Sequence, residues 1–489
     1  MNSEAVLRGL EPAKVFRYFE EICSIPHGSG NTAQISEYLV HFAEEQGLSY
    51  CTEACGNVII RAEATPGYEH EPGIILQGHM DMVAVQDADC GKDMKTEGLS
   101  IFTDGRLVGA EKTSLGGDDG IALAYGLAIL SDRTIPHPAL ELLVTVDEET
   151  GMDGAMALDP GNLTGTRLIN LDSEEEGSFI VGCAGGETLR LNRNVSREAA
   201  PDGWHTYELS VSGLTGGHSG TEIDKNRANA ILLLGRALQN ISEACPYRLF
   251  LIEGGTKDNA IPVYARALIS APKMPETAEI EAEWRNALSG KENALKLEMK
   301  AFCGHSGTAD SFVTERKVMR EEVANDLVRL LSIIPYGVSA MSTLPGLVET
   351  SNNVGIIRTY EERIEIAVSV RSLIASEKKE LSRRIGTIAS LCGFQVSVHG
   401  GYPGWQYREQ SPLRDKAVRA FVEEYGKEPV VQTIHAGLEC GLLIEKMPGL
   451  DAVSMGPDIY DIHTTKERLD VASVQRTWKL LLRILSMKD

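Results

Sequence analysis

The chain lacks the two kinds of apolar segment that would place it in a membrane or outside the cell. It has no uninterrupted apolar run of the about 18 residues that a membrane span requires, and no signal-peptide core near its N-terminus. Residues 4–22 instead have the pattern of an amphipathic helix, with Leu7, Val15 and Phe19 interspersed with charged residues. We therefore predict a cytoplasmic protein without a membrane partner.

Positive charge is also scarce. The chain has 47 lysine and arginine residues against 70 aspartate and glutamate residues, and its formal net charge at pH 7 is −23. A surface of this charge repels polyanions, so we expect neither nucleic acid nor an anionic membrane as a partner. It suits a site that concentrates divalent cations, although charge alone does not show such a site.

Paired cysteines are missing as well. Among nine cysteines, Cys51 and Cys55 form the one close pair, and no partner pair stands at zinc-ribbon spacing. We expect free thiols in a reducing compartment. With 489 residues, of which 43% are apolar and 24% charged, the chain has the composition of an ordinary globular protein with two or three domains.

The first third of the chain alternates short apolar runs with helical stretches. The runs 74–77, 140–146 and 167–171 are mostly apolar and do not alternate with polar residues, which is typical of parallel strands that are buried on both faces. This pattern predicts an α/β domain whose mainly parallel sheet is flanked by helices.

The pattern changes near residue 185 and returns near residue 386. Between these points, runs such as 206–212 and 364–370 alternate apolar and polar residues, as strands of an antiparallel sheet with helices on one face do. We predict a main domain formed by residues 1–185 and 386–489, which is interrupted by an inserted α+β domain at residues 186–385.

The insert contains an internal repeat. The sequence Gly-His-Ser-Gly-Thr at residues 217–221 recurs at residues 304–308, and residues 255–261 have a weaker echo at residues 350–356. The similar spacing of the two pairs predicts that the insert arose by duplication of one unit.

Five short segments carry acidic or histidine residues, and most of them follow an apolar run. They are residues 78–81, 116–120, 147–151, 170–173 and 461–463. Because an open α/β sheet binds its ligands at the carboxyl ends of its strands, we expect these segments to converge there. A site for two metal ions needs one bridging carboxylate, together with one histidine and one carboxylate for each ion. One set of residues suffices for this purpose: His79, Asp118, Glu149, Asp172 and His463.

The neighbours of these residues suggest supporting roles. A carboxylate two residues after His79, at Asp81, can accept the second ring N–H and fix the tautomer. Of the adjacent Asp118 and Asp119, one can cap a helix while the other faces a cation, and we assign the bridge to Asp118.

Three successive carboxylates, at residues 147–149, end an apolar strand. They repel one another unless a cation or a raised pKa relieves the repulsion. Because adjacent side chains point in different directions, one can bind a metal while its neighbour acts as a base. A solvated acidic loop is the alternative interpretation.

In this order, the motifs GHMDMV, GGDDG, DEETG, NLDSEEEG, GGHSG and DIHT resemble those of the co-catalytic di-zinc peptidases, which include carnosinases, aminoacylases and tripeptidases. The stretches VGCAGGE (181–187) and IHAGLECGLL (434–443) are most similar to the branch of bacterial aminoacyl-histidine dipeptidases. The resemblance covers nearly the whole chain.

The resemblance implies a role for each matching residue. His79 and Asp172 would hold one zinc ion, Glu149 and His463 the other, and Asp118 would bridge them. Asp81 would orient His79, and Glu148 would be the general base. The family usually has Asp-Asn where this chain has Asp118-Asp119, so manganese and cobalt are alternatives to zinc.

The resemblance also implies a reaction. Dipeptides of the Xaa-His type, such as β-alanyl-histidine, would be hydrolysed by a hydroxide held between the two metal ions, with the insert acting as a lid on the catalytic main domain. An N-acyl-amino-acid deacylase and a non-catalytic peptide-binding protein are the alternatives. The partner is expected to be a small peptide, and the chain is expected to be a monomer or a homodimer.

The lid would supply further groups. His218 would stabilise the oxyanion, with His305 of the repeat as the alternative, and Asn259 and Arg371 would bind substrate. An arginine can pair bidentately with a free carboxylate, although a solvated or salt-bridged arginine is an equally simple interpretation. His435 is expected near the site as a substrate-binding residue.

Overall fold

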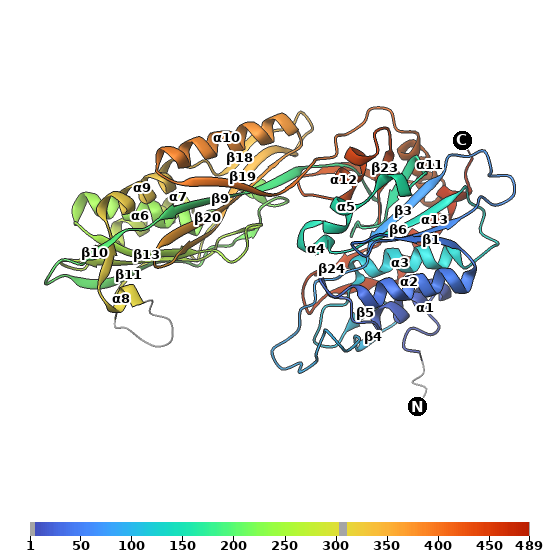
Figure 1. Ribbon diagram of the computed structural model, residues 1–489, viewed down its shortest axis with the longest axis horizontal. Coiled ribbons are helices and arrows are strands. Elements are labelled where there is room, and N and C mark those ends of the chain that lie inside the picture. The colour runs from blue at the N-terminus through green and yellow to red at the C-terminus, as the bar shows by residue number, and fades with distance from the viewer. Residues whose placement is uncertain (1–4, 303–310, 489) are drawn as a thin grey trace. The chain divides into compact units, whose positions relative to one another are not determined.

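The computed structural model describes residues 5–302 and 311–488, and the chain forms two compact units (Figure 1). The first unit comprises Met1–Gly182, Trp405–Thr433 and Leu438–Asp489, and the second comprises Cys183–Gly404 and Ile434–Gly437.

The boundary that we predicted at residue 386 differs from the one observed. Residue 386 lies inside helix α10 (Ala375–Leu391), which packs on the second unit's sheet, and the following strand β21 (Gln395–Tyr402) pairs with strand β9 (Gly185–Asn194) of that sheet. The chain therefore leaves the second unit only after Gly404. Four residues, Ile434–Gly437, return to it later, a crossing that the sequence pattern did not predict.

The first unit is built on an eight-stranded sheet with the order β1-β2-β6-β3-β7-β23-β8-β22. Its strands are β1 (Ser49–Thr52), β2 (Val58–Ala62), β3 (Ile74–His79), β6 (Leu140–Thr145), β7 (Arg167–Asn170), β8 (Ser178–Cys183), β22 (Val430–Ile434) and β23 (Asp451–Ser454). The central strands β6, β3, β7 and β23 pair in parallel, whereas the pairs β1–β2, β2–β6 and β23–β8 are antiparallel. The predicted α/β fold is confirmed, with antiparallel pairs added on both sides of the parallel centre.

Helices cover both faces of this sheet, which explains why its central strands are buried throughout and mostly apolar. Two adjacent residues of β3 show the two faces. Gly78 faces helix α3 on one side of the sheet, and the preceding residue, Gln77, donates a hydrogen bond to Glu439 of helix α12 on the other side. The helices are α1 (Ala13–Cys23), α2 (Ala33–Gln46), α3 (Gly117–Leu130), α4 (Glu148–Gly151), α5 (Asp153–Ala157), α11 (Pro412–Tyr425), α12 (Glu439–Lys446) and α13 (Val471–Ser486).

A smaller four-stranded sheet completes the first unit, with the order β24-β25-β5-β4. Its strands are β4 (Ile101–Thr103), β5 (Leu107–Ala110), β24 (Ile459–Tyr460) and β25 (Arg468–Asp470). It therefore joins the C-terminal region, in which His463 lies, to the first third of the chain.

Helix α3 is the buried centre of the first unit. Every residue from Gly117 to Leu130 is buried, as expected for a helix that is apolar on all sides. No side chain of its own caps its start. Instead the Glu467 carboxylate accepts hydrogen bonds from the backbone N–H groups of Leu115 at 2.9 Å and Gly117 at 2.7 Å. Residues about 350 positions apart thus fix the turn from which Asp118 projects.

The second unit contains an antiparallel sheet with the order β16-β11-β15-β13-β19-β20-β9-β21, to which β18 is added beside β19. Its further strands are β11 (His205–Ser212), β13 (Arg248–Gly254), β15 (Ala265–Ala271), β16 (Lys296–Ala301), β18 (Gly337–Met341), β19 (Val348–Thr359) and β20 (Arg363–Ser372). Two-stranded ribbons are formed by β10 (Arg197–Ala199) with β17 (Lys317–Met319), and by β12 (Gly217–His218) with β14 (Ala260–Ile261).

The strand order shows two equivalent halves. One half runs β11-α6-β13-β15-α7-β16, and the other runs β9-α9-β19-β20-α10-β21, so each is a βαββαβ unit. If the four strands of each half are numbered along the chain, their order in the sheet is 4-1-3-2 in both halves: β16-β11-β15-β13 and β21-β9-β20-β19. The halves meet where β13 pairs with β19. This arrangement is the one expected of a duplicated unit. The repeat at residues 304–308, which includes His305, lies outside the described residues.

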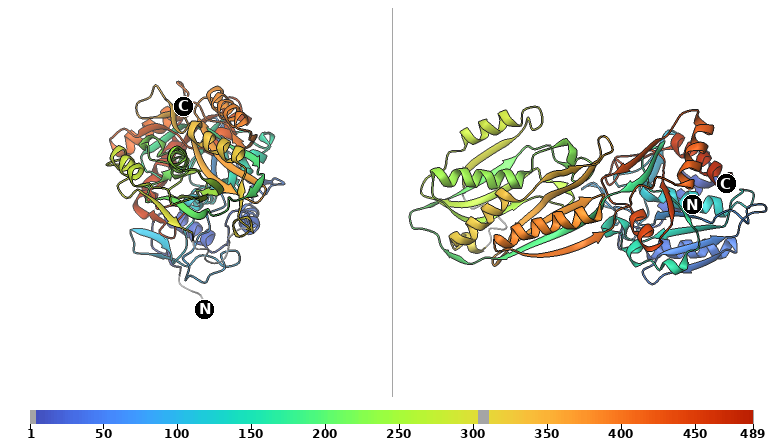
Figure 2. Two further views of the ribbon diagram at one scale, coloured as in Figure 1. Left: turned by 90° about the vertical axis from the view of Figure 1, so that its left-hand side faces the viewer. Right: turned by 90° about the horizontal axis from the view of Figure 1, so that it is seen from above.

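With the exception of the short helix α8, whose Phe312 and Val313 belong to a separate apolar cluster, the helices of the second unit lie on one side of its sheet, as Figures 1 and 2 show for α6, α9 and α10. They share one apolar core with the strands, to which Leu209, Ile252, Leu234, Leu331 and Ile385 belong. The helices are α6 (Ala230–Ala244), α7 (Ala278–Ala287), α8 (Ser311–Thr314), α9 (Glu321–Ile333) and α10. In the described part of the chain, no helix is both long enough and apolar enough to cross a membrane.

The close approach of β3 to α3 gives a test of the first unit. A Cβ atom on Gly78 would lie 2.5 Å from Asp119 Oδ2 and 2.6 Å from the Cβ of Ala122. We expect Gly78→Ala to push α3 away from β3 and to lower the free energy of unfolding by about 1–3 kcal/mol, as measured by urea denaturation. The control is Gly73→Ala, because the nearest atom there, Gly165 Cα, would lie 3.5 Å away. Equal losses for the two variants would contradict this account.

Candidate metal centre

Asp118 lies between two histidines of the first unit. Its Oδ1 atom is 3.0 Å from His79 Nε2, and its Oδ2 atom is 3.2 Å from His463 Nε2. Each imidazole therefore faces a different oxygen of one carboxylate. This is the arrangement required of a carboxylate that bridges two metal ions.

Each histidine also faces a second carboxylate. Asp172 Oδ1 lies 3.5 Å from His79 Nε2, and Glu149 Oε1 lies 2.8 Å from His463 Nε2. Two sets of potential ligand atoms, each within 4.8 Å of one another, result: His79, Asp118 and Asp172 in one, and Asp118, Glu149 and His463 in the other. The structure thus brings all five predicted ligands together.

The strand ends explain this convergence. His79 is the last residue of β3, Glu149 lies in α4 just after β6, and Asp172 follows β7 by two residues. These strands are parallel neighbours, so their carboxyl ends open at one edge of the sheet. His463 comes from a loop after β24 and has a left-handed backbone, with φ 60°.

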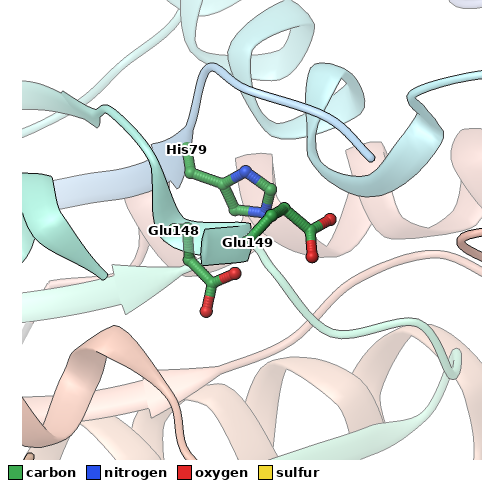
Figure 3. A group of neighbouring side chains, drawn as sticks. All are labelled: His79, Glu148 and Glu149. Carbon is green, nitrogen blue, oxygen red and sulfur yellow. The ribbon is translucent and has the colours of Figure 1, made fainter. Parts of the chain in front are cut away.

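Adjacent residues at the start of α4 point in different directions, as Figure 3 shows for Glu148 and Glu149 beside the His79 ring. These three residues form a third set of potential ligand atoms within 4.8 Å. The divergence leaves Glu148 available for a role other than that of Glu149.

Asp81 faces the His79 ring with two groups, of which its backbone carbonyl is nearer than the carboxylate that the sequence predicted. The backbone carbonyl of Asp81 accepts the Nδ1–H hydrogen bond of His79 at 2.9 Å, whereas its carboxylate lies 3.5 Å from that nitrogen. Because a carbonyl can only accept, the Nδ1 atom carries the proton and Nε2 is left to face the carboxylates. The Asp81 carboxylate instead accepts from the backbone N–H of Glu148 at 3.0 Å and from the Ser29 hydroxyl at 2.8 Å.

Of the two roles expected for Asp119, to cap α3 or to support a metal-facing residue, the structure shows no capping contact and fits the supporting role. Its Oδ2 atom accepts the backbone N–H of His79 at 3.2 Å, while Glu467 satisfies the start of the helix. The side chain is buried, and burial together with the charge of Asp172 raises its pKa well above the usual value.

The pKa values of the site reflect crowded negative charge. Burial raises the pKa of Asp172 to about 6, and burial also raises that of Glu148, with Asp172 and Glu439 adding to the effect. Burial lowers the pKa of His463, but the carboxylates of Asp118 and Glu149 outweigh it and raise the value to about 10. For Asp118, burial is outweighed by hydrogen bonds from both histidines, so its pKa is lowered.

Glu439 is a member of the site that sequence reasoning left without a role. It is fully buried, and its Oε2 atom accepts hydrogen bonds from Gln77 Nε2 at 2.6 Å and Thr145 Oγ1 at 2.7 Å. Burial raises its pKa to about 7. The available signal was Gln77, a polar residue in an otherwise apolar strand two positions before His79.

The donor set fits two divalent cations. It offers two imidazole nitrogens and several carboxylates, which are the ligands that zinc and related ions take. Among the described residues, histidines supply the strongest positive charges that act on the carboxylates of Asp118, Asp172 and Glu148, and they lower the pKa of each. Cations would therefore offset a charge excess that the protein itself leaves.

The four predicted substrate-binding and oxyanion residues all lie in the second unit. Strand β12, which ends at His218, pairs with β14, and the Ser219 N–H donates to the carbonyl of Asn259 at 2.8 Å. Burial, with a further contribution from the charges of Arg371 and His218, lowers the pKa of His435 to about 3. Arg371, His218 and His435 are thus close enough to influence one another.

A model of peptidase family M20/M25/M40 matches residues 75–487, and the chain belongs to this family. It is accordingly an enzyme, a metallopeptidase. The family resemblance that the motifs predicted is confirmed.

Full-length relatives agree with this assignment. The chain is 37% identical over 486 residues to the cytosol non-specific dipeptidase of Escherichia coli (strain K12), with 98% of each chain covered. The crystal structure of aminoacylhistidine dipeptidase from Vibrio alginolyticus matches with a TM-score of 0.82 and 35% identity, covering 100% of this chain and 99% of that one. Aminopeptidase PepT from Bacillus cereus ATCC 10987 shares the fold, with a TM-score of 0.56, 17% identity and 98% of each chain covered.

The raised pKa values predict how the metal-free protein responds to pH. At a pH between the ordinary and the raised pKa of a group, that group is protonated in the folded chain but not in the unfolded chain. This range runs from 3.8 to about 6 for Asp172, from 4.5 to about 7 for Glu439 and from 6.5 to about 10 for His463. Because the folded state binds more protons than the unfolded state, its stability falls as pH rises from about 5 to 8. The lowered pKa of Asp118 acts in the opposite direction below its ordinary value of 3.8. The lowered pKa of His435 also acts in that direction, up to its ordinary value of 6.5, so the fall in stability is expected to be clearest from about pH 6.5 to 8.

The measurement is urea unfolding of chelated and zinc-loaded protein at several pH values in this range. Zinc should stabilise the protein more at pH 8 than at pH 5, because ligands must lose their protons to bind it. A stabilisation by zinc that shrinks as pH rises would contradict the assignment of these groups to a metal centre.

Proposed function

We propose that the chain is a dinuclear dipeptidase that cleaves Xaa-His dipeptides, such as β-alanyl-histidine, and a broader range of dipeptides. The observation that carries the proposal is the Asp118 carboxylate, whose two oxygens face His79 and His463 with Asp172 and Glu149 beside them. His79, Asp172 and Asp118 would hold one ion, and Glu149, His463 and Asp118 the other. Zinc suits these ligands, with manganese and cobalt as alternatives.

Glu148 is the general base in this proposal. Bound divalent ions supply an activated water and polarise the scissile carbonyl. Glu148 takes the proton of that water and later delivers it to the leaving amine. Its backbone N–H is held by the Asp81 carboxylate, and its raised pKa helps the carboxyl to retain the proton between the two steps.

His218 has the tautomer that an oxyanion donor needs. Its Nδ1 atom accepts the backbone N–H of Thr221 at 3.1 Å, so the ring proton lies on Nε2, where it can be donated. A fixed donor of this kind stabilises the negative charge that develops on a peptide carbonyl oxygen. We assign this function to His218.

Arg371 is suited to a substrate carboxylate. Among the described residues it has no carboxylate partner, and its Nε atom is buried without a hydrogen-bond acceptor. A buried guanidinium donor without a partner is costly, so an anionic ligand is expected there. The neighbouring His435, which is held by a 2.7 Å hydrogen bond between its Nε2 and Ser351 Oγ, and Asn259 would complete the substrate site.

Dipeptides are favoured as substrates by the names of the full-length relatives, a non-specific dipeptidase and an aminoacylhistidine dipeptidase. The cytoplasmic location expected from the sequence agrees with the cytosolic designation of the Escherichia coli relative. An N-acyl-amino-acid deacylase would use the same metal centre, and the substrate panel below separates the two.

The test of this function combines elemental analysis of the purified protein with activity on a substrate panel before and after chelation. We expect about two divalent ions per chain, cleavage of Xaa-His and other dipeptides, loss of activity on chelation and its recovery with zinc, manganese or cobalt. Preferential cleavage of acetylated amino acids would indicate the deacylase instead. Full dipeptidase activity after complete removal of metal would refute the proposal.

The base assignment is tested by Glu148→Gln. The amide cannot take up the proton, so we expect kcat to fall about 10²- to 10⁴-fold while the metal content stays unchanged. The matched control is Glu45→Gln at an exposed position of α2, which should retain normal activity. Near-normal turnover of the Glu148 variant would show that another group is the base.

A further inference from the structure

A row of three residues crosses the sheet of the second unit at Gly186. Gly186 lies in β9, opposite Arg371 of β20 on one side and opposite Tyr402 of β21 on the other. Cross-strand neighbours on one face of a sheet normally touch through their side chains. In this row, the middle position has no side chain.

Tyr402 occupies the space that Gly186 leaves. A Cβ atom on Gly186 would lie 2.3 Å from the Tyr402 hydroxyl oxygen and 2.5 Å from its Cζ atom. The same hydroxyl accepts a hydrogen bond from Arg371 Nη1 at 2.7 Å. The tyrosine ring therefore reaches across β9 to a guanidinium on the strand beyond it, and it can do so only because residue 186 is glycine.

The backbone around this row is held in place. The register of β21 against β9 shifts between His399 and Tyr402, with Gly400 at φ +58°, so the tyrosine returns to pairing after a bulge. The buried Lys378 of α10 donates to the carbonyl of Tyr402 at 2.7 Å and to that of Gly186 at 3.2 Å. One ammonium group thus ties together the two strands that the ring crosses.

A tyrosine suits this position because its hydroxyl is neutral. A carboxylate at the same distance would fix Arg371 equally well, but it would cancel the charge that an anionic ligand requires. The hydroxyl orients one nitrogen of the guanidinium and leaves its positive charge in place. The buried Nε atom of Arg371 remains without an acceptor among the described residues.

We propose that Tyr402, in the space left by Gly186, is the positioning residue that aims the Arg371 guanidinium at the free α-carboxylate of a dipeptide. The inference rests on the proposed function of Arg371. It adds that selection of a free carboxylate depends on a tyrosine and a glycine, neither of which needs to touch the substrate. The tyrosine acts through the orientation of Arg371.

The test compares a dipeptide with its C-terminal amide, which has no carboxylate for Arg371 to bind. In the full metal-loaded enzyme, Arg371→Ala should raise KM for the dipeptide about 10- to 100-fold and leave metal content unchanged. Tyr402→Phe, which removes only the hydroxyl, should raise KM about 3- to 10-fold with kcat nearly unchanged. Neither variant should alter KM for the amide, or its inhibition constant if it is not hydrolysed.

Two further comparisons separate positioning from a general structural effect. Tyr402→Phe should have no additional effect on KM in the Arg371→Ala background, because the hydroxyl acts through the guanidinium. Gly186→Ala should reproduce or exceed the effect of Tyr402→Phe. The matched controls are Tyr360→Phe, at an exposed tyrosine of the same unit, and Gly386→Ala, whose new Cβ would meet Val396 Cγ1 at an ordinary 3.7 Å.

The possible failures are distinguishable. If Arg371→Ala selectively weakens the dipeptide while Tyr402→Phe does not, the function of Arg371 stands and the positioning role of Tyr402 is wrong. If Arg371→Ala changes neither KM value, the assignment of Arg371 is wrong and the inference falls with it. Because Gly186→Ala can impair folding, Tyr402→Phe is the deciding variant.

Discussion

The shared position of Asp118 between His79 and His463 is the constraint on which the first unit is built. Several carboxylates surround these two imidazoles, and burial, together with the charges of neighbouring carboxylates, raises the pKa of Asp172, Glu148 and Asp119. The rigid elements that do so are apolar: the parallel strands carry the residues to one edge, and the wholly buried helix α3 presents Asp118. Burial of the apolar core thus supplies the free energy that keeps these carboxylates close together, which a flexible loop could not do.

Sequence reasoning reached the site residues because strand ends can be recognised locally. His79, Glu149 and Asp172 each follow an apolar run, and the rule that strands of an open sheet converge at their carboxyl ends placed them together. The same reasoning did not predict that the backbone carbonyl of Asp81 lies closer to the His79 ring than its carboxylate does, because side-chain chemistry does not show which backbone group an imidazole will meet. It missed the role of Glu467 because a cap supplied from about 350 residues away leaves no local pattern.

The alternation of apolar and polar residues predicted the antiparallel sheet of the second unit, but it did not predict the residue at which that unit ends. Helix α10 and strand β21 have compositions compatible with either unit, and only the pairing of β21 with β9 decides between them. The return of Ile434–Gly437 is decided in the same way, by long-range contacts such as the hydrogen bond from the Ala184 N–H to the carbonyl of Ile434. The predicted duplication rested on a short sequence repeat, and the matching order of strands and helices in the two βαββαβ halves is what such a duplication would produce.

The empty position at Gly186 also limits how this protein can change. A larger residue there is tolerable only where residue 402 has become smaller, and such an exchange would leave Arg371 without its present support. Homologous chains should therefore vary at these two positions in concert or not at all. If Arg371 binds a free carboxyl terminus as proposed, variation at both positions would mark a lineage in which that selectivity has weakened, even where every metal-facing residue is retained.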